Sequence, residues 1–276
     1  MKLGYGTYGM PTVDIFDALP RLRDIGYQAV EINVGEEWPT APRKLSAAKR
    51  TQLTHTIRDL EFPPPVLMCL LPICTLGEGR EAALDKFDEA CALARDLNFG
   101  DGPIPVVSTP GGIHGDWDER KNLLRDTLLM VADRSAKHNV ILAVEPHAGQ
   151  MLDTPQKVAW LMKQTQHEFL KVNFDISHFH VAGIDLKQSV DLCAPYTVST
   201  HVKDGAMIEG KVRYQLPGEG SLDLVAYFKA IADAGISCPV TVEVTAQIWR
   251  QEGYDPWPAA VSSFQALDNA RREAGL

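Results

Sequence analysis

Four short hydrophobic runs in the second half of the chain each lead to a side chain that can bind a divalent metal ion. The four side chains are those of Glu145, Asp175, His201 and Glu243. They are separated by 30, 26 and 42 residues, and one strand–helix–strand crossover takes about 30 residues or more. The spacing therefore predicts that they lie at the ends of consecutive parallel strands, where they would form one site.

Three carboxylates and one imidazole suit a hard or borderline divalent cation. Oxygen-rich ligation favours Mn²⁺ or Mg²⁺, with Co²⁺ also accommodated, and the lack of thiolate argues against structural zinc. Taken singly, each residue has an ordinary explanation, since a glutamate at a strand end is usually an ion-pair partner. Four suitable residues at four successive strand ends are harder to explain in that way. We therefore expect a site for one divalent ion, with Mn²⁺ as the expected metal.

The elements that must position these residues alternate between strand and helix. Short aliphatic and β-branched runs bounded by glycine or proline predict eight strands. The predicted strands cover about residues 2–9, 29–35, 66–71, 104–109, 140–144, 170–174, 198–202 and 239–244. Helical spacing of apolar residues predicts the intervening helices. Their expected N-caps include Ser46, Asp116 or Asp118, Thr154 and Ser221.

Eight strand–helix units with no linker or low-complexity tract predict one α/β domain over residues 1–276. Eight parallel units at this length favour a closed (β/α)8 TIM barrel over an open, doubly wound sheet. The active site of such a barrel lies at the carboxyl ends of its strands, where the four candidate ligands fall. The longest irregular segment, residues 205–220, includes a stretch compatible with a small hairpin around Glu209-Gly210.

The composition excludes several other classes of protein. A net charge of −9 argues against a nucleic-acid partner, because such proteins need a basic face. No run approaches the roughly 18–20 apolar residues of a membrane span, and the first residues lack a signal-peptide pattern. The five cysteines include no C-x-x-C pair, which is typical of buried thiols in a reducing compartment. We expect a cytoplasmic protein without a membrane partner.

Several short motifs resemble the xylose isomerase-like TIM barrels. That superfamily holds sugar phosphate isomerases and epimerases, ketose 3-epimerases, inosose isomerases and dehydratases, and endonuclease IV. The motifs are Val144-Glu-Pro-His147, Asp175-Ile-Ser-His178, His201-Val-Lys-Asp204, Gly218-Glu-Gly220 and Val242-Glu243. The resemblance covers nearly the whole chain. It implies that the four candidate ligands hold one divalent metal, that Glu145 and Glu243 also act as the acid/base pair, and that His178 binds substrate hydroxyls.

General chemistry agrees with this resemblance. Removing a proton next to a carbonyl creates an enediolate, which a metal ion stabilises. Two carboxylates on opposite faces of the substrate can take the proton from one side and return it on the other. We therefore expect a metal-dependent isomerase or epimerase of a keto-sugar or sugar phosphate. The alternatives are a lyase (a dehydratase, or an enzyme that cleaves a 3-keto-glycoside or C-glycoside) and a non-catalytic sugar-binding barrel.

The chain departs from the ketose 3-epimerases at one position. Those enzymes generally carry an arginine six residues after the strand-seven histidine, whereas this chain has Met207. The Lys203-Asp204 pair is closer to the sugar-phosphate and inositol-pathway branches, and Lys203 is a candidate contact for an anionic substrate. Endonuclease IV fits poorly, because it needs three zinc ions and many histidines.

Further candidates for the substrate pocket are His147, His114 and Trp38. The glycine pairs in the chain lack a G-x-G-x-x-G pattern, so no nucleotide cofactor is expected. The expected partner is a small sugar or sugar derivative. The long loop over residues 249–257 is expected to reach over the site or to form a subunit contact, in a dimer, a tetramer or a larger complex.

Overall fold

Eight parallel strands close into a barrel in the computed structural model, which describes all 276 residues. The strands are β1 (Leu3–Gly6), β2 (Ala29–Asn33), β3 (Val66–Pro72), β4 (Pro105–Thr109), β5 (Ile141–Val144), β6 (Leu170–Asp175), β7 (Thr197–Val202) and β10 (Val240–Val242). Each strand pairs in parallel with its neighbours in chain order, and β1 closes the ring against β10. The predicted (β/α)8 barrel is confirmed.

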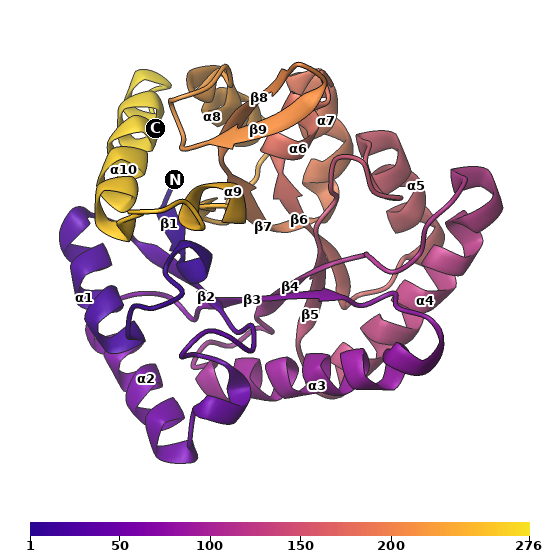
Figure 1. Cartoon of the computed structure of the whole chain (residues 1–276), viewed down its shortest axis with the longest axis horizontal. Coiled ribbons are helices and arrows are strands. Elements are labelled where there is room, and N and C mark those ends of the chain that lie inside the picture. The colour runs from indigo at the N-terminus through magenta and orange to yellow at the C-terminus, as the bar shows by residue number, and fades with distance from the viewer.

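A ring of helices surrounds the barrel (Figure 1). These helices are α1 (Ile15–Ile25), α2 (Ala47–Asp59), α3 (Arg80–Leu97), α4 (Trp117–Lys137), α5 (Pro155–Thr165), α7 (Leu186–Cys193), α8 (Leu224–Asp233) and α10 (Pro256–Glu273). None of these helices combines the length and the apolar character that a membrane-spanning helix requires. The smaller elements follow strand ends: α6 (Ile176–Val181), the antiparallel hairpin β8 (Asp204–Ile208) and β9 (Lys211–Gln215), and α9 (Ala246–Trp249).

Side-chain caps fix where most of the helices begin. Ser46, Asp116 and Thr154 accept hydrogen bonds from the first turns of α2, α4 and α5, as predicted. The prediction that Ser221 caps the helix that is now α8 is wrong. Asp223 caps α8 by accepting from the backbone N–H of Ala226, and its carboxylate directly precedes the helix, where negative charge is favoured.

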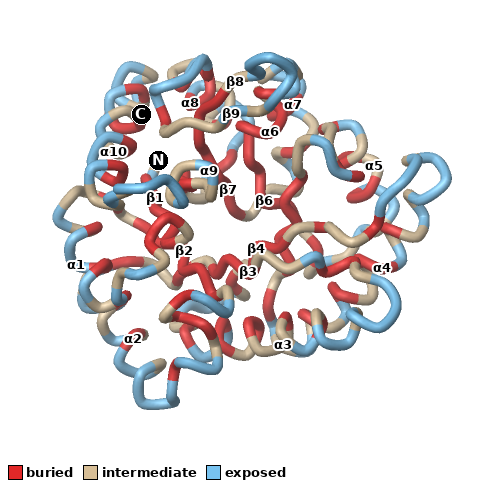
Figure 2. The backbone as a smooth tube through the Cα atoms, viewed as in Figure 1, coloured by how far each residue is buried: buried red, intermediate tan, exposed pale blue.

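The interior of the barrel is apolar at one end and polar at the other. Figure 2 shows buried residues along the strands and exposed residues on the outer surface of the helices. Most buried charged side chains lie at or near the carboxyl ends of the strands, including those of Glu31, Glu145, Asp175, Lys203 and Glu243. Buried charges are costly unless they are paired or bind a metal. The fold therefore places a concentrated polar site at one mouth of the barrel.

Candidate metal centre

The four predicted ligands lie together at this mouth. Their ligand atoms all fall within 4.8 Å of one another, and all four residues are buried. Glu145 and Glu243 directly follow β5 and β10, Asp175 ends β6, and His201 lies near the end of β7. These four strands are consecutive neighbours in the barrel, and Asp175 and His201 are paired in the β6–β7 register. The four side chains thus come together because their strands are neighbours in the barrel.

His201 is held by carboxylates on both ring nitrogens. Its Nδ1 lies 2.6 Å from Glu145 Oε1 and 2.9 Å from Asn173 Nδ2. Its Nε2 lies 2.9 and 2.8 Å from the two carboxylate oxygens of Glu31, a residue of β2. A carboxylate on the outer nitrogen is the usual partner of a metal-ligating histidine. Glu31 therefore orients Nδ1 toward the cluster, a role that sequence reasoning did not assign to it.

Lys203 lies inside the cluster. It is 1% exposed, and its Nζ forms ion pairs with Asp175 Oδ2 and Glu243 Oε2. Burial alone lowers the pKa of this lysine, but the two carboxylates raise it well above its usual value. The ammonium therefore stays charged and holds two of the four candidate ligands in place.

The cluster carries more negative than positive charge. Four carboxylates, those of Glu31, Glu145, Asp175 and Glu243, face two cationic side chains, those of His201 and Lys203. Full ionisation leaves an excess of two negative charges. In addition, the buried Oε2 of Glu145 has no hydrogen-bond partner. A divalent cation would balance this charge and engage this oxygen, so the donor set fits such an ion.

The two glutamates of the cluster have opposite pKa shifts. Burial alone raises the pKa of Glu145, but the charge and hydrogen bond of His201, with weaker effects of His147 and Lys203, lower it to about 2. Burial dominates at Glu243 and, with the nearby charge of Glu145, raises its pKa to about 7 despite the ion pair with Lys203. A pair of carboxyls pushed apart in this way is typical of acid/base assignments in enzymes.

Two histidines border the cluster. The rings of His147 and His178 have centroids 3.7 Å apart, and His147 Nδ1 lies 3.5 Å from Glu145 Oε2. Burial lowers the pKa of His178 well below its usual value, and the charge of Lys203 adds to this effect. The hydroxyl of Tyr214 lies 2.6 Å from His178 Nδ1. Sequence reasoning predicted the hairpin that carries Tyr214 but not this contact.

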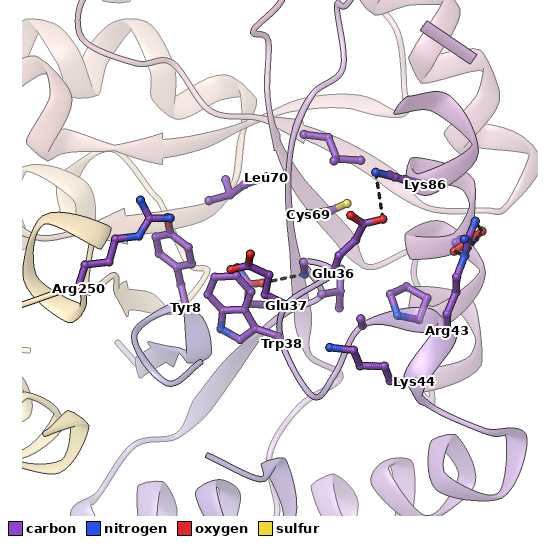
Figure 3. A pocket seen from close by; sticks show the side chains of 17 residues that line it. Tyr8, Glu36, Glu37, Trp38, Arg43, Lys44, Cys69, Leu70, Lys86 and Arg250 are labelled. Atoms are coloured by element: carbon purple, nitrogen blue, oxygen red, sulfur yellow. Dashed lines mark hydrogen bonds and ion pairs between the residues drawn. The ribbon is translucent and has the colours of Figure 1, made fainter. Parts of the chain in front are cut away.

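The remaining predicted site residues lie farther from the ligands. His114 is exposed in the loop after β4, and no side-chain hydrogen bond or ion pair joins it to the cluster. Trp38 is 8% exposed and donates its indole N–H to the carbonyl oxygen of Thr7 over 3.2 Å. It lines a cavity of about 450 Å³ at the carboxyl ends of β1, β2 and β3 (Figure 3).

Known proteins resemble this chain mainly in fold. A 3-dehydroshikimate dehydratase from Bacillus anthracis is 24% identical over 173 residues, which cover 61% of this chain and only 56% of that relative. The crystal structure of D-psicose 3-epimerase with D-fructose has a TM-score of 0.79 at 15% identity, covering 100% of both chains. A 3-keto-D-glucoside 4-epimerase from E. coli has a TM-score of 0.75 at 15% identity, covering 98% of this chain and 99% of that one.

A family assignment follows from the sequence as a whole. The family model described as xylose isomerase-like TIM barrel matches residues 19–268, a span that contains all four candidate ligands, Glu31, Lys203 and both cluster histidines. The match agrees with the closed barrel and with the motifs at its strand ends. The chain belongs to the xylose isomerase-like TIM barrel family.

Proposed function

We propose that the protein is a divalent-metal-dependent isomerase or epimerase that acts on a keto-sugar or a sugar phosphate. The observation that carries this proposal is the pair Glu145 and Glu243, two buried carboxyls that lie in one metal-ligand set with Asp175 and His201. The structural resemblance to D-psicose 3-epimerase and 3-keto-D-glucoside 4-epimerase supports the same class of reaction. We propose Mn²⁺ as the resident ion, with Mg²⁺ or Co²⁺ as alternatives.

The chain's own residues divide the proton transfers. A bound divalent ion supplies positive charge that stabilises the oxyanion developing when a proton leaves a carbon next to a carbonyl. Glu145 is ionised at neutral pH and can accept that proton. Glu243 is the second carboxyl of the set and can return a proton to the substrate. Epimerisation requires the two carboxyls to act on opposite faces of the substrate.

The substrate-binding role belongs to the groups that surround these carboxyls. We propose that His178, His147 and Lys203 contact substrate oxygens. Both histidines lie beside Glu145 or Asp175, and the buried ammonium of Lys203 lies 3.5 Å from His178 Nε2. Trp38 contributes to the adjoining cavity, and His114 stays a prediction from the sequence. A cytoplasmic location and assembly into a dimer, a tetramer or a larger complex also stay predictions from the sequence.

A lyase on the same scaffold is the second candidate. The sequence match to a 3-dehydroshikimate dehydratase favours it, because elimination of water can begin with the same removal of a proton next to a carbonyl. The outcome then depends on whether the intermediate regains a proton or expels a neighbouring substituent. A barrel that binds a sugar without turning it over is a third candidate, which the intact ligand set opposes.

Proton NMR in D₂O distinguishes these functions. The Mg²⁺-loaded protein is incubated separately with free ketoses, ketose phosphates, an inosose, a 3-keto-glucoside and 3-dehydroshikimate, and Glu243→Gln serves as the control. Deuterium next to the carbonyl, in a product of unchanged composition, is the result we expect. Loss of water or of an aglycone would establish a lyase instead. No exchange with any compound, while the metal stays bound, would contradict the proposal.

A further inference from the structure

The cavity and the metal cluster occupy opposite halves of one barrel mouth. The cluster ligands come from β5, β6, β7 and β10, whereas the cavity lies at the carboxyl ends of β1, β2 and β3. A volume of about 450 Å³ is in the range of small-molecule sites. A substrate that reaches both would have its reacting carbons at the cluster and the rest of its structure in this cavity.

Two of the four cations that line the cavity are neutralised by carboxylates. Arg43 pairs with Glu89 through hydrogen bonds of 2.7–3.0 Å, and Lys86 pairs with Glu36 at 3.0 Å. The other two, Lys44 and Arg250, have no carboxylate oxygen within 4.0 Å. Figure 3 shows them at opposite ends of the cavity, with Arg250 beside Tyr8.

Arg250 is exposed and lies over the ring of Trp249, which belongs to an aromatic cluster. Its guanidinium carbon lies 4.9 Å from the ring centre of Trp249, a contact that stabilises a cation. Trp249 in turn packs edge-on against Tyr8 and Trp38, with ring centroids 5.6 and 5.7 Å apart. These contacts leave the hydrogen-bonding edge of the guanidinium without a protein acceptor. A planar guanidinium of this kind suits a carboxylate or a phosphate, which it can bind through two parallel hydrogen bonds.

Tyr8 lines the cavity beside Arg250. The pKa of its phenol is raised chiefly by burial. The charges of Glu243 and Glu145 raise it further, whereas those of Arg250 and Lys203 lower it. Tyr8 is therefore close enough to Arg250 and to the cluster to be affected by the charges of both. An anionic substituent in the cavity would be attracted to the unpaired cation of Arg250.

We propose that Arg250 binds an anionic group of the substrate, a carboxylate or a phosphate, when the reacting carbons lie at the metal cluster. This inference rests on the proposed function and narrows its substrate class to sugar acids or sugar phosphates. Arg250, in the loop after β10, would then be the arginine that binds the substrate. The ketose 3-epimerases carry theirs six residues after the strand-seven histidine, where this chain has Met207, which cannot bind an anion.

A series of three ligands that differ at one carbon tests the proposal. D-fructose, D-fructuronate and D-fructose 6-phosphate carry a hydroxymethyl, a carboxylate and a phosphate ester at carbon 6. Isothermal titration calorimetry measures their affinity for the Mg²⁺-loaded protein. We expect at least one anion to bind at least about tenfold more tightly than fructose, as for a hydrogen-bonded charge pair. The anion that is preferred identifies the substrate class.

Two matched variants locate the effect. Arg250→Met should remove the preference for the anion and leave fructose binding unchanged, whereas Lys44→Met removes one charge at the other end of the cavity and should keep the preference. The proposal would be overturned if the three ligands bound equally or if none of them bound. It would also be overturned if the preference for the anion survived in Arg250→Met. Loss of the preference in Lys44→Met alone would overturn it as well.

Binding and turnover separate this inference from the proposed function. The calorimetric preference does not require a reaction. An anion preference that depends on Arg250, without deuterium exchange in any substrate, would refute the proposed reaction alone. Deuterium exchange in neutral and anionic ketoses alike, with no effect of Arg250→Met on affinity, would refute the anion site alone.

Discussion

Glu31→Gln is predicted to weaken metal binding although Glu31 belongs to no candidate ligand set. The residue is 2% exposed, and its oxygens lie 2.8 and 2.9 Å from His201 Nε2. Glutamine keeps the size and one hydrogen-bond acceptor but removes the negative charge that increases the basicity of the imidazole. Loss of such a partner typically costs about 10- to 100-fold in metal affinity, or about 1.4–2.7 kcal/mol. Because one hydrogen bond is retained, we expect a value near the lower limit.

The assay is titration of the metal-free protein with Mn²⁺, followed by calorimetry or by loss of the free-ion electron paramagnetic resonance signal. Glu78→Gln is the matched control, because Glu78 is exposed and forms no ion pair. Melting of each metal-free variant is followed by circular dichroism, so that loss of the fold is recognised. An affinity of Glu31→Gln within twofold of the wild type, with the fold intact, would refute the orienting role of Glu31.

Three further predictions concern the same cluster. Glu243→Gln should abolish deuterium exchange and weaken Mn²⁺ binding, and near-wild-type values in both assays would remove Glu243 from both roles. Tyr214→Phe removes the hydroxyl that lies 2.6 Å from His178 Nδ1. We expect kcat/KM to fall about 5- to 10-fold without a change in Mn²⁺ affinity. A change confined to metal affinity would contradict this prediction. Metal affinity should rise with pH, because Glu243 and His201 must both lose protons to bind an ion. The pKa of Glu243 is about 7. The pKa of His201, despite its burial, is raised well above its usual value by Glu31 and Glu145. Calorimetry between pH 6 and 8 should show proton release and up to about a tenfold gain per pH unit for each proton released, and a flat profile would contradict it.

Much of the fold is visible in the sequence because most barrel strands are short aliphatic runs bounded by glycine, proline or a polar residue. The hairpin after β7 was also predicted, since Glu209-Gly210 is a turn pair and both residues have positive φ. The six-residue helix α6 was not predicted, because it is too short to give a periodic pattern. It begins where Asp175 accepts a hydrogen bond from Ser177, so a candidate metal ligand also serves as a helix cap.

The four-residue ligand set could be predicted because all its members follow strands that are neighbours in a barrel. Glu31 could not be assigned to the site, since it lies 170 residues from His201 and its contact depends on side chains meeting across the barrel interior. The inward direction of Lys203 follows from strand alternation, because positions 201 and 203 lie on the same face. The ion pairs of Lys203 with two candidate ligands required the three-dimensional structure.

Anomalous diffraction from a crystal soaked with Mn²⁺ tests the central claim most directly. We predict one peak within about 2.0–2.3 Å of one ligand atom each from Glu145, Asp175, His201 Nδ1 and Glu243, as expected for first-row divalent ions. A strong peak elsewhere, or no peak with Lys203 still paired to Asp175 and Glu243, would contradict the assignment of these four residues as a metal centre.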